Sequence, residues 1–177
     1  SWLEKAANTN PQAIQPHLLL ARYLLAKGEN TKAVLAAREA VNVQPKNPAA
    51  LDLLGTAQFA SKDLGNALDT CRKLVDQLPN QAEPRLKLAQ VQIAMKQTEA
   101  ARKTLQKALG MKPDLIEAQL MLGDLEIQSA RYDEAHKIAK QIQQQKPDSP
   151  AGLVLEGDAA LARKQYPAAL AAFERAH

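Results

Sequence analysis

The amino-acid sequence predicts an all-α fold, a solenoid of antiparallel helix pairs, and several series of residues that share one period carry this prediction. Prolines, alanines and small residues each recur every 34 residues, at different phases. The prolines are Pro11, Pro45, Pro79, Pro113 and Pro147, and the alanines are Ala33, Ala67, Ala101, Ala135 and Ala169. The small residues are Ala21, Gly55, Ala89, Gly123 and Gly157. Because the series agree in period without any insertion, we interpret the chain as a repeat protein.

Within one period the apolar residues follow the spacing of a helix. Leu51, Leu54 and Gly55 begin one such stripe, and a second stripe begins at Leu64 after a break near Lys62-Asp63. The proline of each period ends the second helix, because it lacks an amide hydrogen and disfavours helical backbone before it. We therefore expect two helices of roughly 13 residues in each repeat, which are stable only when they stack on their neighbours.

This pattern resembles the tetratricopeptide repeat family, whose units are helix-turn-helix pairs. The matching residues are a small residue at the eighth place, alanine at the twentieth and proline at the thirty-second. The resemblance covers the whole chain and implies a right-handed superhelical solenoid. It divides a single array, 1–177, into the tail of a preceding repeat (1–13), four complete repeats (14–47, 48–81, 82–115 and 116–149) and an incomplete fifth repeat (150–177). Since this array begins inside a second helix, we expect it to be a piece of a longer repeat protein.

One place of the repeat departs from the pattern in the last unit. The seventh place holds leucine in the four complete repeats and Glu156 in the fifth. Two interpretations follow, a fifth repeat that packs more loosely or a glutamate that meets a helix of a partner.

Composition and charge exclude several classes of protein. A single cysteine, Cys71, excludes an internal disulfide framework and a cysteine-rich zinc site. The chain has 23 Lys+Arg and 19 Asp+Glu, a net charge of +4, so we expect no nucleic-acid partner. No apolar stretch approaches the roughly 18 residues of a membrane span.

Residues suited to catalysis are scattered along the chain. His17, His136 and His177 fall at different phases of different repeats, and Cys71 stands at a place where a small buried side chain is expected. No phosphate-binding loop, nucleophile elbow or metal-spaced histidine pair is present. We therefore predict no catalytic residue, no cofactor-binding residue and no metal site, and a protein that is not an enzyme.

The resemblance implies that the first helix of each repeat lines the concave side of the superhelix. The fifth, sixth and twelfth places are mainly apolar, while the ninth is polar, so these residues can form a groove for an amphipathic helix or an extended apolar peptide. Alternatively, much of the apolar line packs between neighbouring helices. The candidate partner-binding residues are Leu18, Arg22, Leu25, Leu53, Thr56, Phe59, Leu86, Lys87, Gln90, Ile93, Leu120, Met121, Asp124, Ile127, Val154, Asp158 and Leu161.

Basic residues gather on two successive second helices. The favoured interpretation is a solvated outer face, and the alternative is an anionic partner such as an acidic polysaccharide or a lipid headgroup. Nucleic acid is the weakest candidate, because no aromatic residues for base stacking are interleaved. The residues are Arg102, Lys103, Lys107 and Lys112, then Lys137, Lys140 and Lys146.

Three stretches, 54–58, 82–90 and 149–158, are similar to the large bacterial tetratricopeptide lipoproteins of the PEP-CTERM/exosortase system. Those proteins are associated with exopolysaccharide production and protein sorting at the cell envelope. This second resemblance implies an exported parent protein, periplasmic or anchored at the outer membrane. Without it, the expected location is the cytoplasm.

The predicted function is that of a non-enzymatic protein-protein interaction scaffold, whose apolar groove binds a peptide or helix of an envelope partner. One alternative is a rigid spacer or self-association module, whose exposed repeat ends stack on further repeats or on another copy. A second alternative is a regulatory domain of an enzyme that lies outside this segment. The partner is a protein or peptide whose identity the sequence does not specify.

Overall fold

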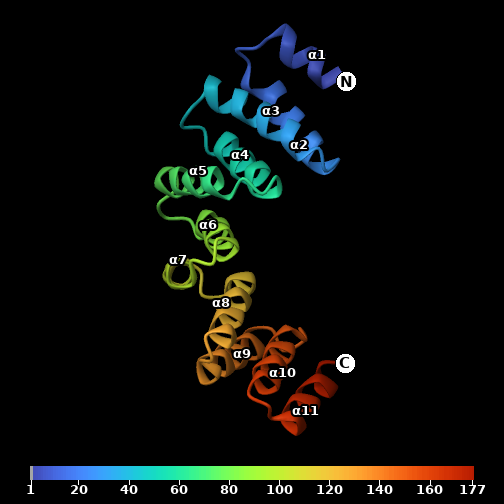
Figure 1. The fold of residues 1–177 in the computed structure, drawn as a ribbon, viewed down its shortest axis with the longest axis vertical. Coiled ribbons are helices and arrows are strands. Elements are labelled where there is room, and N and C mark those ends of the chain that lie inside the picture. The colour runs from blue at the N-terminus through green and yellow to red at the C-terminus, as the bar shows by residue number, and fades with distance from the viewer. Residues whose placement is uncertain (1) are drawn as a thin grey trace. The chain divides into compact units, whose positions relative to one another are not determined.

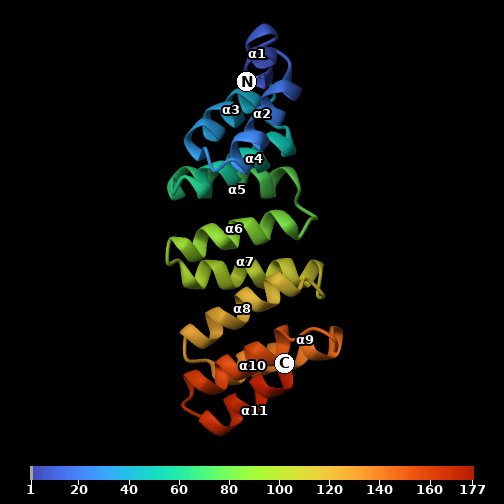
Figure 2. The same ribbon diagram turned by 90° about the vertical axis from the view of Figure 1, so that its right-hand side faces the viewer.

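The computed structural model describes residues 2–177, and in this range it contains eleven α-helices and no strand, which confirms the predicted all-α class (Figures 1 and 2). Short turns join the helices, and the breaks fall where the periodic pattern predicts them. The helices are α1 Trp2–Thr9, α2 Ile14–Ala26, α3 Asn30–Val43, α4 Pro48–Ala60, α5 Leu64–Gln77, α6 Glu83–Ala94, α7 Thr98–Met111, α8 Ile116–Gln128, α9 Tyr132–Gln145, α10 Ala151–Ala162 and α11 Tyr166–Ala176.

The helices divide into two compact units. The first unit ends at Gln97 and contains α1 to α6, and the second unit, Thr98–His177, contains α7 to α11. The division falls between the two helices of the predicted repeat 82–115. No helix of residues 2–177 combines the length and the apolar character that crossing a membrane requires.

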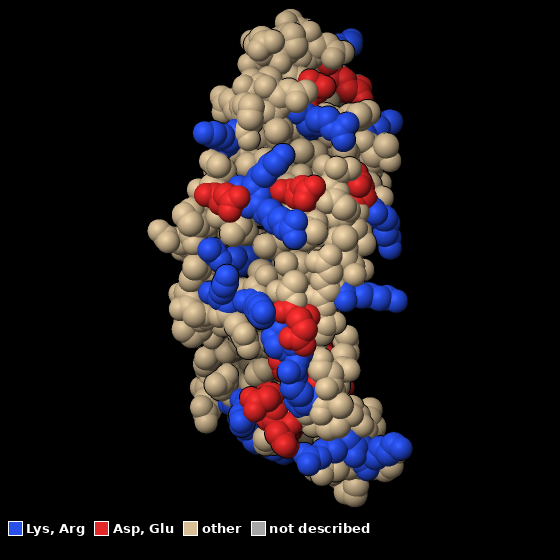
Figure 3. All heavy atoms as spheres, turned by 60° about the vertical axis from the view of Figure 1, so that its left-hand side comes forward, with Lys and Arg blue, Asp and Glu red and all other residues tan. Residues whose placement is uncertain are grey.

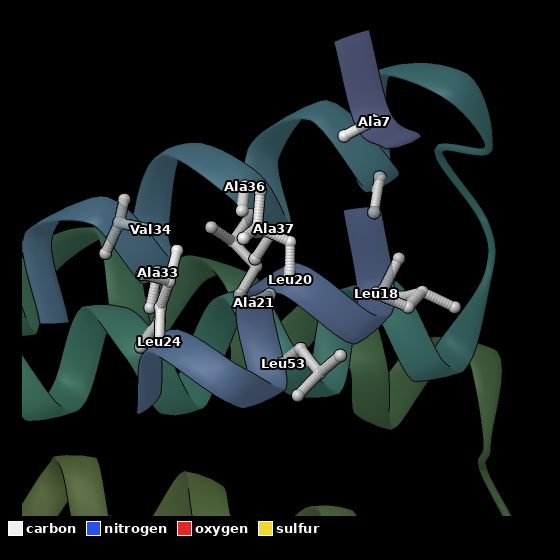
Figure 4. Packing of buried hydrophobic residues seen from close by; sticks show 14 residues of the cluster. Ala7, Leu18, Leu20, Ala21, Leu24, Ala33, Val34, Ala36, Ala37 and Leu53 are labelled. Carbon is white, nitrogen blue, oxygen red and sulfur yellow. The ribbon is translucent and has the colours of Figure 1, made fainter. Parts of the chain in front are cut away.

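In the first unit, each helix packs against its neighbours in sequence, and α2 also contacts α4. One apolar cluster joins α1, α2, α3 and α4 (Figure 4). Leucines of α2 and α4 fill it, and alanines such as Ala21, Ala33 and Ala37, with no exposed surface, let the helices approach closely. A separate, smaller cluster joins α5 and α6 and includes Leu68 and Val91.

The second unit repeats this arrangement with a different core. Its helices also contact their sequence neighbours, and α8 contacts α10 directly. Ala139 and Ile142 of α9 pack against Leu155 of α10, and partly buried residues of α8 complete the cluster.

Each turn inside a helix pair contains one residue in the left-handed backbone region. The residue that follows it donates its N–H to a carbonyl near the end of the first helix, as Glu29 does to Leu24 at 2.9 Å and Arg131 to Glu126 at 2.8 Å. This hydrogen bond ends the helix in the manner of a Schellman motif. The left-handed residues are Gly28, Lys62, Lys96, Ala130 and Lys164, with φ of 74°, 66°, 58°, 57° and 62°.

A proline and a polar cap begin α4. The Asn47 side chain accepts hydrogen bonds from the N–H groups of Ala49, at 3.0 Å, and Ala50, at 3.2 Å. Pro48 occupies the first helical position, where its missing N–H leaves no backbone partner unsatisfied. Helices α6 and α11 also have a proline within their first two positions, where a missing N–H costs no helical hydrogen bond.

The small residues of the repeat lie at close contacts between helices, but their neighbours differ from the simplest expectation. The sequence suggests that the glycine of the eighth place meets the alanine of the twentieth. Instead, a Cβ atom on Gly55 would lie 3.2 Å from the Cys71 Sγ, and one on Gly157 would strike the Phe173 ring. Cys71 and Phe173 both occupy the twenty-fourth place, so in these two repeats the close contact lies about one turn further along the second helix. Gly123 differs, because a Cβ there would strike Leu155 of α10.

Candidate functional site

The predicted inner-face residues of the first unit fall into two groups by burial. Leu18, Leu53 and Leu86 are buried and belong to the packing between helices, as the alternative interpretation of the apolar line expected. The remaining residues are accessible, and these are Arg22, Leu25, Thr56, Phe59, Lys87, Gln90 and Ile93.

Several of these accessible residues surround a hollow between α4, α5 and α6, here named the α4–α6 pocket. Its volume is about 120 Å³. Four of its lining residues were predicted from the sequence as inner-face residues. Gly55 and Cys71 were predicted from their repeat positions as residues of the helix contact, and Val91 carried no prediction. The lining residues are Gly55, Thr56 and Phe59 of α4, Cys71 of α5, and Lys87, Gln90 and Val91 of α6.

A polar group of side chains forms the rim of this pocket. The Lys87 ammonium group forms an ion pair with the Asp52 carboxylate, and it also donates a hydrogen bond to Thr56 Oγ1 at 3.2 Å. Both charged side chains are partly exposed, so the pair contributes at most about 1 kcal/mol to stability. Its main effect is to hold the Lys87 side chain between α4 and α6, beside the pocket.

The thiol of Cys71 lies in the wall of the pocket and is 3% exposed. Burial raises its pKa to about 11. At pH 8 only about one thiol in a thousand is then ionised, and the thiolate is the reactive form. We expect iodoacetamide to modify Cys71 far more slowly in the folded chain than in urea, which mass spectrometry after timed quenching can measure. Equal rates in both states would show that the thiol is accessible.

The predicted inner-face residues of the second unit are all at least partly accessible. Asp124, Val154 and Leu161 are exposed, and the two apolar side chains among them keep 41% and 48% of their surface. The partly exposed residues are Leu120, Met121, Ile127 and Asp158.

Two carboxylates of this face, those of Asp124 and Asp158, have pKa values raised above the usual range. Burial raises the pKa of Asp124, and the nearby charge of Asp158 raises it further. Burial also raises the pKa of Asp158. Because folding disfavours the charged form of both groups, each ionised carboxylate lowers the stability of the folded state at neutral pH.

A second hollow, of about 230 Å³, lies between α9, α10 and α11 of the same unit. Glu156 lines it and contacts Lys140 Nζ at 3.0 Å and Gln143 Nε2 at 2.7 Å. Burial by itself raises the pKa of Glu156, but hydrogen bonds from Gln143 and Lys140 outweigh burial, so the pKa lies below its usual value. Glu156, which replaces the leucine of the seventh place, therefore finds partners for its carboxylate inside the unit, on α9.

The cluster of basic residues on α7 is not a uniform outer face, because Arg102 is buried. Its Nε lies 2.7 Å from Glu126 Oε1, it pairs with Glu99, and it donates a hydrogen bond to Ser129 Oγ at 3.0 Å. Arg131 pairs with the other oxygen of Glu126, at 2.7 Å. Figure 3 shows basic and acidic side chains lying close together on the face that it draws, which does not favour a purely anionic partner there.

His17 and His136 lie on different helices and make different contacts, and His136 Nδ1 lies 3.8 Å from Glu156 Oε1. His17 is buried, and its Nε2 lies 3.0 Å from the Pro11 carbonyl oxygen, so it bonds to the backbone. The described residues contain no group of three or more His, Cys, Asp or Glu side chains that could hold a metal ion.

Comparison with known families agrees with this architecture. Tetratricopeptide repeat models match residues 18–82, 58–114 and 100–155, which together cover more than half of the chain. The chain therefore belongs to the tetratricopeptide repeat family. Proteins of this family are generally non-enzymatic scaffolds for protein interactions. No curated protein sequence matches this chain.

Solved structures show the same fold. A tetratricopeptide repeat protein from Parabacteroides merdae superposes with a TM-score of 0.85 at 19% identity, over 98% of this chain and 69% of that one. MamA from Desulfovibrio magneticus gives 0.80 at 16% identity, over 92% of both chains. YrrB, described as a tetratricopeptide repeat protein with an unusual peptide-binding site, gives 0.74 at 19% identity, over 99% of this chain and 91% of YrrB. At these identities the likeness shows the fold alone.

Proposed function

We propose that this chain is an interaction scaffold that binds a peptide or helix of a partner protein, and that the α4–α6 pocket receives an apolar side chain of that partner. The observation that carries this proposal is a hollow with an apolar floor and a polar rim on the predicted inner face. Such a combination is typical of sites that bind one anchoring side chain and orient the segment around it.

The size of the pocket indicates the kind of anchor. Its volume of about 120 Å³ equals that of about four water molecules, which is close to the size of a branched aliphatic side chain. Gly55, Cys71 and Val91 line the pocket with apolar atoms, and the missing side chain of Gly55 lets α4 lie close to the Cys71 thiol. Leucine, isoleucine or valine of a partner would displace water from these apolar walls.

The rim supplies groups for the backbone of the partner. Lys87 can donate to a carbonyl, and Thr56 Oγ1, which donates its own hydrogen to the Asp52 carbonyl oxygen at 2.8 Å, can accept from an N–H. The peptide-binding site named for YrrB supports the choice of a peptide ligand by analogy of fold. The proposed envelope setting, in exopolysaccharide production or protein sorting, has only the three similar sequence stretches as support.

Selection of peptides from a displayed random library tests this proposal. Peptides selected on the wild-type chain should share an aliphatic residue, and Phe59→Glu should weaken their binding by about tenfold or more, because a carboxylate would enter an apolar contact. Leu35→Glu is the matched control, since Leu35 is 57% exposed on α3 and does not line the pocket. Circular dichroism should first show that both variants fold.

Two results would contradict the proposal. The first is that every selected peptide binds Phe59→Glu as tightly as the wild type. The second is a selection that enriches no aliphatic residue.

Self-association is the second candidate function, and sedimentation velocity at increasing protein concentration tests it. Tyr166 and Leu170 favour it, since both are about 60% exposed on α11.

A further inference from the structure

In the second unit, the inner faces of α8 and α10 carry exposed apolar side chains. Val154, Asp158 and Leu161 are spaced four and three residues apart, so they lie along one face of α10. Met121, Asp124 and Ile127 have helical spacing on α8, and α8 contacts α10 directly. We name these six residues the α8–α10 face. It places two carboxylates among four accessible apolar side chains.

The carboxylates of this face lack a basic partner. No lysine or arginine of the described second unit forms an ion pair with Asp124 or Asp158, whereas Glu156 and Asp133 nearby in sequence pair with Lys140 and Arg163. Asp124 and Asp158 occupy the same repeat place on α8 and α10, which contact each other directly, so the two carboxylates stand on neighbouring helices of one face. The charge of Asp158 accordingly raises the pKa of Asp124. Like charges without a counter-charge repel, so a cation placed between them gains from both.

The two carboxylates and the apolar side chains of the α8–α10 face together favour one kind of ligand over others. Two carboxylates without a third ligand are a poor site for a bound metal ion, and the described residues contain no larger group. An acidic or purely neutral segment would bring its own repulsion or leave the carboxylates without a counter-charge beneath it. A segment with both aliphatic and basic side chains meets both requirements.

We infer that the α8–α10 face binds a basic, aliphatic segment of a partner protein, with lysine or arginine beside Asp124 and Asp158 and aliphatic side chains against Val154 and Leu161. This inference rests on the proposed function, since it names the chemistry of the partner. It concerns a different surface from the α4–α6 pocket, so each can fail without the other.

Fluorescence anisotropy can test the inference with the full chain. The probe is a short fluorescein-labelled peptide of Leu, Lys and Ala, with Leu and Lys on one helical face, and its twin has Glu in place of Lys. The test variant is Asp124→Asn/Asp158→Asn. The control, Asp114→Asn/Asp148→Asn, removes the same charge from exposed loop residues of the same unit. Both variants should fold, because asparagine keeps the shape of aspartate and the test variant removes carboxylates that folding disfavours.

The expected result is binding of the Lys peptide to the wild type and the control, with affinity lost by about tenfold or more in the test variant at about 0.15 M salt. The Glu twin should not bind. Equal loss in both variants would overturn the inference, since it would reveal attraction to net charge only. Equal binding of the Glu twin, or no binding of the Lys peptide to the wild type, would also overturn it. The effect of Phe59→Glu on selected peptides is independent of all these outcomes and reports on the proposed function alone.

Discussion

Gly152→Ala is expected to destabilise the chain by about 3 kcal/mol, although it adds a single methyl group to a helix. A Cβ atom at this position would lie 2.7 Å from the Ala139 carbonyl oxygen and 2.9 Å from the Gln143 backbone nitrogen. Both neighbours are backbone atoms of α9, so no side-chain rotation relieves the contact. Helices α9 and α10 would have to move apart, and the packing of Ile142 against Leu155 would loosen with them.

Urea unfolding followed by circular dichroism measures this effect. Gly65→Ala is the matched control, because a Cβ on Gly65 meets nothing within 4 Å and the residue also lies in a helix. There the same substitution should raise stability by about 0.5 kcal/mol, since alanine restricts the unfolded chain more than glycine does. A Gly152→Ala variant as stable as the control would mean that α9 and α10 do not approach as closely as the structure has them.

Glu126→Leu is expected to destabilise the chain by about 3 kcal/mol. Glu126 and Arg102 have side chains only 6% and 7% exposed, and they join α8 to α7 inside the second unit. Leucine would leave the Arg102 guanidinium in a buried site without its buried counter-charge. The contacts of Arg102 with Glu99 and Ser129 remain, so the expected loss lies at the lower end for a broken buried pair.

The double variant Glu126→Leu/Arg102→Met separates the loss of an interaction from the isolation of a charge. Because it removes both charges and fills the space with apolar atoms, its stability should return to within about 1 kcal/mol of the wild type. Asp133→Asn is the control, since it breaks the exposed pair with Arg163 and should change stability by less than about 1 kcal/mol. A double variant that stays as unstable as Glu126→Leu would contradict this expectation, because the loss would then come from the missing interactions and not from an isolated buried charge.

The helical repeat was predictable because its signal is repeated along the chain. The periodic prolines and small residues indicated the helix pairs, and α2 to α11 lie where that pattern places them. The turn residues were not predictable as a series. Lysine or alanine occupies the left-handed position in four of the five turns, and only Gly28 has the side chain that such a backbone favours.

The candidate site was predictable only in part. Repeat positions named Thr56, Phe59, Lys87 and Gln90, but the same rule also named Leu18, Leu53 and Leu86, which are buried. The rule fails there because the fifth and sixth places lie at the edge between the inner face and the helix contact, and small rotations of a helix decide which side a residue joins. The partners of Arg102 and Glu156 lie on other helices, and periodicity does not reveal which polar side chains meet across them.

Most contacts in this chain join helices that follow one another in sequence, and this affects how binding of a partner changes the stability of each helix. Each helix in either unit is held mainly by the helices next to it, so regions can open independently and the chain need not unfold as one cooperative block. A partner bound at the α4–α6 pocket would then slow amide hydrogen exchange in α4, α5 and α6, and the protection would fade toward α1. Binding would therefore stabilise the few helices near the contact and leave the stability of the distant helices almost unchanged.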